Sequence, residues 1–87
     1  MEVVSDIRSK SALARVIRQF KDWETRIKQY HNESGDFRSL CEDYAVCERA
    51  LEKWQASDTA MAAQRQQEYE ELLAELRNEI QDWLEQR

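Results

Sequence analysis

Apolar residues along the chain fall into three runs in which spacings of three and four residues alternate. Such spacing averages 3.5 residues and places the members of each run on one stripe of an α-helix. All aromatic residues of the chain belong to these stripes, so the pattern predicts three helices that pack through aromatic-rich faces. The runs are Leu13, Val16, Phe20, Trp23, Ile27 and Tyr30; Phe37, Leu40, Tyr44, Cys47, Leu51 and Trp54; and Tyr69, Leu73, Leu76, Ile80 and Trp83.

Polar and turn-forming residues separate the runs. We expect a single helical domain over residues 1–87, with helix one over about 9–32, helix two over about 36–55 and helix three over about 58–86. Gly35 is expected to adopt the left-handed conformation at the end of helix one, and Asp36 to cap helix two. Because this turn is short, helices one and two should form an antiparallel helical hairpin.

The second junction, near residues 55–59, contains neither Gly nor Pro. Ser57 and Asp58 are candidate N-caps for a third helix. The alternative is one continuous helix of roughly 50 residues, about 75 Å long, with an insertion in its heptad pattern. We favour a turn, because it lets three helices cover one core as a three-helix bundle.

Composition supports an all-α fold and excludes other classes. The chain has 87 residues, of which one is Gly and none is Pro, and 41% are hydrophobic. A β-rich fold needs tight turns built from such residues, and disorder is excluded by the large apolar side chains. No apolar run approaches the roughly 20 residues of a membrane helix, and the N-terminus lacks the pattern of a secretory signal. The expected location is therefore cytoplasmic, away from membranes.

The predicted core is small for the number of residues that must be ordered. The buried aromatic area offsets only part of the conformational entropy lost on folding, so a monomer would be marginally stable. Self-association into a homodimer or a larger bundle is therefore expected. Bulky rings also suit a bundle of several helices better than a thin two-stranded coiled coil, whose core positions favour Leu, Ile and Val.

The charges are distributed unevenly along the chain, whose net charge is −5. Residues 1–30 have a local balance of +3, and residues 31–87 one of −8. The basic residues of helix one are expected to face outward, and the acidic ones of helix three share an outer face that could meet them in another subunit. The overall acidity argues against nucleic-acid binding, although weak contact through the basic face stays an alternative. The two sets are Arg15, Arg18, Lys21 and Lys28, and Glu68, Glu71, Glu75, Asp82 and Glu85.

No pattern in the chain indicates a catalytic, cofactor or metal site. His31 is the single histidine, which excludes helical di-iron and zinc-protease patterns. One glycine cannot build a phosphate-binding loop. Cys41 and Cys47 lie about 120° apart on a helix, so we expect reduced thiols, with an intermolecular disulfide or a redox role as the alternative. We therefore predict no enzyme activity, no cofactor and no metal.

One stretch resembles known proteins. It runs Phe37-Arg38-Ser39-Leu40-Cys41-Glu42-Asp43-Tyr44 through Ala50-Leu51-Glu52-Lys53-Trp54, with a Leu-Cys-x-Asp-Tyr pattern followed by Ala-Leu-x-x-Trp. It is similar to small bacterial helical proteins of unassigned function. The resemblance implies a bacterial cytosolic helical protein and carries no activity or site residue.

Together these features favour a non-enzymatic protein–protein interaction or assembly module that acts through its helix faces. Its expected partners are a second copy of itself and possible further proteins. The alternative is a helical bundle that binds a small apolar ligand near Tyr44 and Trp54. The residues expected in the core or in an interface are Phe20, Trp23, Tyr44, Trp54, Tyr69 and Trp83.

Overall fold

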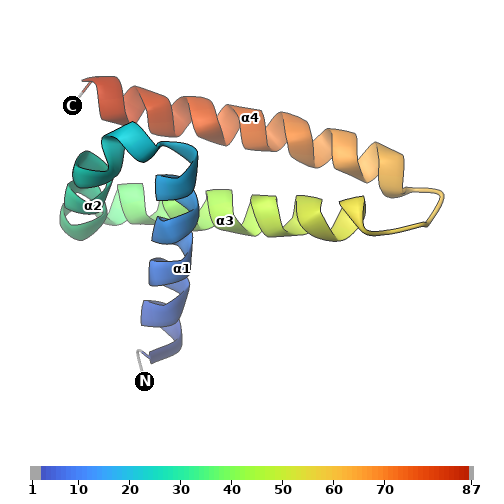
Figure 1. Cartoon of the computed structure of the whole chain (residues 1–87), viewed down its shortest axis with the longest axis horizontal. Coiled ribbons are helices and arrows are strands. Elements are labelled where there is room, and N and C mark those ends of the chain that lie inside the picture. The colour runs from blue at the N-terminus through green and yellow to red at the C-terminus, as the bar shows by residue number, and fades with distance from the viewer. Residues whose placement is uncertain (1–2, 87) are drawn as a thin grey trace.

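The computed structural model describes residues 3–86, and the side chains of residues 10–85. Over this range the chain contains no strand, and its helices pack against one another, which confirms the predicted all-α class. The described residues form four α-helices rather than the predicted three. They are α1 (Val3–Gln19), α2 (Glu24–Glu33), α3 (Gly35–Gln55) and α4 (Ala62–Gln86), with a short 3-10 helix, η1 (Lys21–Trp23), between α1 and α2 (Figure 1).

The longest elements, α3 and α4, form an antiparallel hairpin that runs the length of the molecule (Figure 1). The turn over residues 56–61 separates them, as the sequence favoured, so there is no continuous helix here. Alternating spacings of three and four residues bring the buried side chains of the two helices face to face. These side chains are Phe37, Leu40, Tyr44, Cys47 and Leu51 of α3 and Leu73, Leu76, Ile80 and Leu84 of α4.

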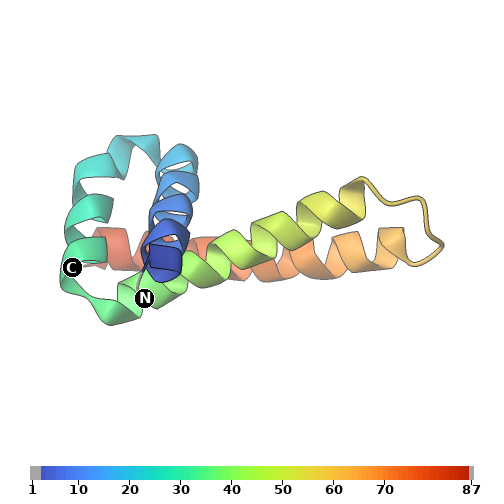
Figure 2. The same ribbon diagram turned by 90° about the horizontal axis from the view of Figure 1, so that it is seen from below.

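Ser34 forms the junction between α2 and α3. Its backbone is extended, and its hydroxyl oxygen accepts a hydrogen bond from the main-chain N–H of Phe37 at 3.2 Å, as an N-cap does. The predicted roles of Gly35 and Asp36 were therefore wrong. Gly35 is the first residue of α3 and has no positive φ, and Asp36 lies inside the first turn. The extended serine turns the chain without a left-handed residue, and α3 then runs across α2 and not back along it, so the predicted antiparallel hairpin of helices one and two does not form (Figure 2).

The helix predicted over residues 9–32 is broken at Phe20, which has a non-helical conformation with φ −126° and ψ 62°. No Gly or Pro marks this break. Its cause lies in the packing, because α1 crosses α3 instead of running along it (Figure 1). A continuous helix would carry Ile27 and Tyr30 away from the core. The break turns the chain back, so that α2 lies beside α1 and Ile27 is fully buried (Figure 2).

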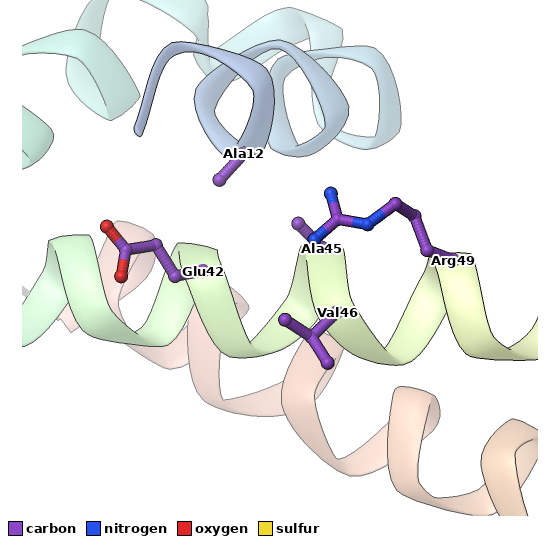
Figure 3. Close-up of a pocket in the computed structure, with 5 residues that line it drawn as sticks. All are labelled: Ala12, Glu42, Ala45, Val46 and Arg49. Carbon is purple, nitrogen blue, oxygen red and sulfur yellow. The ribbon is translucent and has the colours of Figure 1, made fainter. Parts of the chain in front are cut away.

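Two alanines allow α1 to approach α3 closely. Ala12 and Ala45 are 1% and 2% exposed, and their methyl groups point toward each other across the crossing (Figure 3). Small side chains at a helix crossing let the backbones come together, and the neighbouring Val16 is then fully buried. The crossing therefore depends on the small size of both alanines.

An aromatic cluster joins α2, α3 and α4 at the end of the hairpin that lies far from the 56–61 turn. Tyr30, Phe37 and Trp83 contact one another edge to face, with ring centroids 5.3–5.7 Å apart. Nearby, the Arg26 guanidinium donates to the main-chain oxygen of Leu84 at 3.0 Å, close to the C-terminus of α4. A cation at this position also interacts favourably with the helix dipole. Ring packing and this hydrogen bond together fasten α2 to the hairpin.

The other half of the hairpin projects as an arm beyond α1 and α2 (Figure 2). The molecule measures 43 × 34 × 19 Å, and its radius of gyration is 13.9 Å. A compact chain of this length would have a radius of gyration of about 12 Å. The arm therefore exposes helix surface that a compact bundle would cover.

Enlarging either alanine at the crossing should destabilise the fold. We expect A45L to lower the free energy of unfolding by about 1–3 kcal/mol, because the extra carbons force α1 away from α3. Urea denaturation followed by circular dichroism measures the change. The matched control is A14L, at an exposed position of α1, which should stay within about 0.5 kcal/mol of the wild type. Equal stability of A45L and the wild type would contradict a close crossing.

Candidate interaction surface

An apolar groove runs between α3 and α4 along the arm. Its first part is a hollow of about 310 Å³ whose wall is largely apolar. The second part, nearer the 56–61 turn, has a volume of about 420 Å³, and Tyr69 lines both parts. We call the two together the arm groove. Its lining residues are Asp43, Val46, Cys47, Ala50, Lys53 and Trp54 of α3, Ser57 of the turn, and Tyr69, Leu72 and Leu76 of α4.

Large apolar side chains along the arm groove are open to solvent. Val46 is 58% exposed and Leu72 is 44% exposed. The two side chains line opposite walls of the same hollow, Val46 on α3 and Leu72 on α4. Scattered apolar residues are common on protein surfaces, whereas a contiguous apolar strip flanked by polar residues is typical of interaction sites. The arm groove is a contiguous apolar strip of this kind.

The arm groove lies on the side of the hairpin away from α1. On α3, Ala45, Glu48 and Glu52 face α1. At 100° per residue, Asp43 and Ala50 of the groove point about 140–200° away from them. The rest of the described chain therefore covers one side of α3 and leaves the groove side open.

Arg15 anchors α1 to α3 through charge. Its guanidinium lies 2.6 Å from the Glu48 carboxylate and 3.0 Å from that of Glu52, and its side chain is only 16% exposed. The hydrogen bonds to Glu52 and Glu48 raise the pKa of Arg15. The prediction that Arg15 faces outward was therefore wrong. Of the four basic residues predicted to face outward, Arg18, Lys21 and Lys28 are exposed, and the break at Phe20 divides them between separate elements.

The buried Tyr44 hydroxyl belongs to the same polar cluster. It lies 3.3 Å from a carboxylate oxygen of Glu48 and 3.4 Å from the side-chain oxygen of Gln19. Burial is the main cause that raises the pKa of Tyr44 to about 12, with the Glu48 charge adding to it. The Tyr44 hydroxyl therefore stays protonated at neutral pH and donates to the polar side chains around it. These hydrogen bonds satisfy a polar group that would otherwise be buried without a partner.

The two cysteines are free and buried in α3. Burial, with a smaller effect of the Glu42 charge, raises the pKa of Cys41 to about 12, and burial also raises the pKa of Cys47. A thiol must ionise to act as a nucleophile or metal ligand, so both side chains behave as small apolar groups at neutral pH. Cys47 forms part of the floor of the arm groove.

The six residues predicted for the core or interface do not form one site. Tyr44 is fully buried, and the other five are half-buried. Trp54 and Tyr69 line the arm groove together. The remaining four lie in the part of the molecule that α1 and α2 cover: Phe20, Trp23, Tyr44 and Trp83.

Sequence reasoning missed most of the arm groove. Val46 and Ala50 lie just beside the buried stripe of α3, and Leu72 lies just beside that of α4. A second apolar stripe on α3, spaced by four residues from Val46 to Ala50 to Trp54, is the signal that could have indicated it.

A further hollow, of about 270 Å³, lies beside the α1–α3 crossing (Figure 3). Ala12, Ala45 and Val46 form its apolar part, so Val46 borders both this hollow and the arm groove. Glu42 and Arg49 stand at its two ends along α3 (Figure 3). Its position follows from the small side chains at the crossing. Polar and apolar surface are balanced in its wall, so it lacks the apolar character of the arm groove.

Over the described side chains, no three His, Cys, Asp or Glu side chains gather closely enough to hold a metal ion. None of the helices in residues 3–86 combines the length and the apolar character of a bilayer-spanning segment.

Comparison with protein families, with curated proteins and with solved structures finds no match for this chain. The resemblance of residues 37–54 to small bacterial helical proteins therefore stays a prediction.

The Arg15 cluster predicts a loss of stability in acid. The hydrogen bond from Arg15 lowers the pKa of the Glu52 carboxyl below its ordinary value of 4.5. The stabilisation by Glu52 is then fully present above about pH 4.5 and is lost as the pH falls through the lower, folded-state pKa. We expect E52Q to be less stable than the wild type at neutral pH, and the two to converge in acid.

Urea denaturation at a series of pH values measures this difference. The matched control is E70Q, at an exposed position of α4, which should follow the wild type throughout. A gap between the wild type and E52Q that stays constant into strong acid would contradict the ion pair.

Proposed function

We propose that this protein is a non-enzymatic interaction module whose working surface is the arm groove, where it binds a helix-bearing protein partner. The observation that carries the proposal is the open apolar strip that Val46, Tyr69 and Leu72 form between the neighbouring helices α3 and α4. A groove between two helices accepts the apolar face of a third helix, whose side chains fill the space between the ridges.

The length and lining of the arm groove suit a helix better than a small molecule. From Asp43 to Gln55, where α3 ends, the groove follows the helix for 13 residues, which is about 20 Å or between three and four turns, and it then reaches Ser57 in the turn. Sites for small ligands are usually concave and enclose most of the ligand, with a few polar groups that orient it. The arm groove is instead long and open along its side.

The alternative of a small apolar ligand near Tyr44 and Trp54 has less support. These residues lie ten positions apart on α3, about 15 Å along the helix. The Tyr44 hydroxyl points toward Gln19 and Glu48, whereas Trp54 lines the arm groove. Binding of nucleic acid through helix one also has less support, because Arg15 is occupied by two carboxylates of α3.

A cytoplasmic location belongs to this proposal as well. Two buried cysteines without a disulfide are typical of a reducing compartment. The module would then work inside the cell by adding helices to the two that the arm already supplies.

Photo-crosslinking in the source cells tests the proposal. A photoreactive amino acid at Val46 should cross-link to a polypeptide, which mass spectrometry of the product identifies. The same amino acid at Lys28, an exposed position on α2, is the matched control and should give little product. The reason is that only the first probe lies inside the apolar strip that a partner helix would cover.

Two results would contradict the proposal. A small-molecule adduct at Val46 in place of a polypeptide would favour ligand binding. Equal yields of polypeptide cross-links from Val46 and Lys28 would show that the arm groove has no preference for partners over the rest of the surface.

A further inference from the structure

We infer that the occupant of the arm groove is a second copy of this chain, packed antiparallel, so that Asp43 of each copy lies against Lys53 of the other. The inference rests on the proposed function, because it names the partner for the same surface. It follows from the charge layout of the groove, from the position of α1 and α2, and from the area available.

The arm groove has an acidic end and a basic end. On α3, Asp43 lines one end and Lys53 the other. On α4, the stripe that contains Tyr69, Leu72 and Leu76 continues by helical spacing to Arg65 beside Lys53, and to Glu79 at the Asp43 end. Arg65 already pairs with Glu68 at 2.9 Å, so Lys53 is the stronger source of positive charge for a partner.

An antiparallel pairing brings opposite charges together on both helices. On α3 the midpoint between Asp43 and Lys53 is residue 48, which places Val46 opposite Ala50 of the second copy. On α4 the midpoint between Arg65 and Glu79 is Leu72, which then meets its own counterpart. The Cys47 thiol contacts the Tyr69 main-chain oxygen at 3.5 Å, so these two residues lie at the same position along the hairpin axis. Residue 48 and Leu72 are one and three residues away from them, so the two midpoints lie within about one helical turn of each other along that axis. A single two-fold axis therefore pairs opposite charges on both α3 and α4.

The parallel arrangement brings like charges together. A two-fold axis along the hairpin would place α3 of one copy against α4 of the other. Asp43 would then face the acidic end of α4 at Glu79, and Lys53 would face Arg65. Juxtaposed like charges oppose association, so the charge layout selects the antiparallel arrangement.

The shape of the molecule permits this pairing. The covering helices α1 and α2 lie on the other side of α3, so neither blocks the arm groove. In the antiparallel arrangement they also stand at opposite ends of the dimer. Val46 and Ala50 are short side chains at the centre of α3, and small residues let two helices approach closely.

The available area matches a modest interface. The groove side of the arm is about 22 Å long and about 20 Å wide, since each helix with its side chains spans about 10–12 Å. Two copies would bury roughly 900 Å² in projection, close to the about 1,000 Å² that a specific interface needs. We therefore expect a reversible dimer with a Kd in the micromolar range.

Charge reversal of the full-length chain tests the inference. Sedimentation velocity over a range of concentrations should show a monomer–dimer equilibrium for the wild type. In D43K and in K53D, like charges meet at two symmetric positions, so the Kd should rise about tenfold. An equimolar mixture of D43K with K53D should dimerise about as well as the wild type, because each copy then offers the charge that the other lacks. E70K, on the far side of α4, is the matched control and should leave the Kd unchanged.

Each contrary result has its own meaning. A D43K chain that dimerises more tightly would show the parallel arrangement, and a mixture that does not recover would show another register; either overturns the inference. A wild-type chain that stays monomeric also overturns it. The proposed function is judged separately by the identity of the polypeptide cross-linked at Val46, and a different protein there would leave it standing while the second copy is rejected.

Discussion

A pair of packed helices has two sides, and helices that pack against one side leave the other open; the rest of this structure depends on that constraint. The hairpin of α3 and α4 buries its facing stripes, yet the side chains that flank those stripes still need cover. α1, η1 and α2 supply that cover over one side near the end of the hairpin. The opposite side is left with Val46 and Leu72 in solvent. The arm groove is therefore a consequence of where α1 and α2 pack as much as of the residues that line it.

The two sides of α3 differ in the kind of interaction they offer. Toward α1 the helix presents Ala45, for close approach, and Glu48 and Glu52, which hold one arginine. Directional ion pairs of this kind orient a helix, while small side chains such as the alanines let the two backbones approach closely. Toward the groove the helix presents apolar side chains with single charges near the ends. The first arrangement suits a permanent contact within the chain, and the second suits a contact that forms and dissociates.

The elements that depend on hydrophobic spacing could be predicted, and those that depend on tertiary packing could not. Alternating spacings placed Phe37, Tyr44 and Ile80 on buried stripes, where the structure has them. The break at Phe20 has no local signal, because it arises only when α1 must cross α3 and return. Arg15 was predicted to be a surface cation because its two carboxylate partners lie more than 30 positions away along the chain and only the tertiary structure brings them together. The arm groove was missed because Val46 and Ala50 lie beside the buried stripe of α3, and the sequence does not show which side of that stripe the other helices cover.

The three tryptophans occupy three separate environments, and this separation has a practical consequence. Trp83 lies in the aromatic cluster of Tyr30 and Phe37, whereas Trp54 lines the arm groove. Trp23 stacks with the Arg26 guanidinium, 5.4 Å from the ring centroid, at the bend between α1 and α2. Indole emission is sensitive to local polarity, so chains that keep one indole each would give three independent optical signals. Trp83 would report unfolding of the end that α2 covers, Trp23 would report opening of the bend, and Trp54 would report binding in the arm groove. No attached dye would be needed.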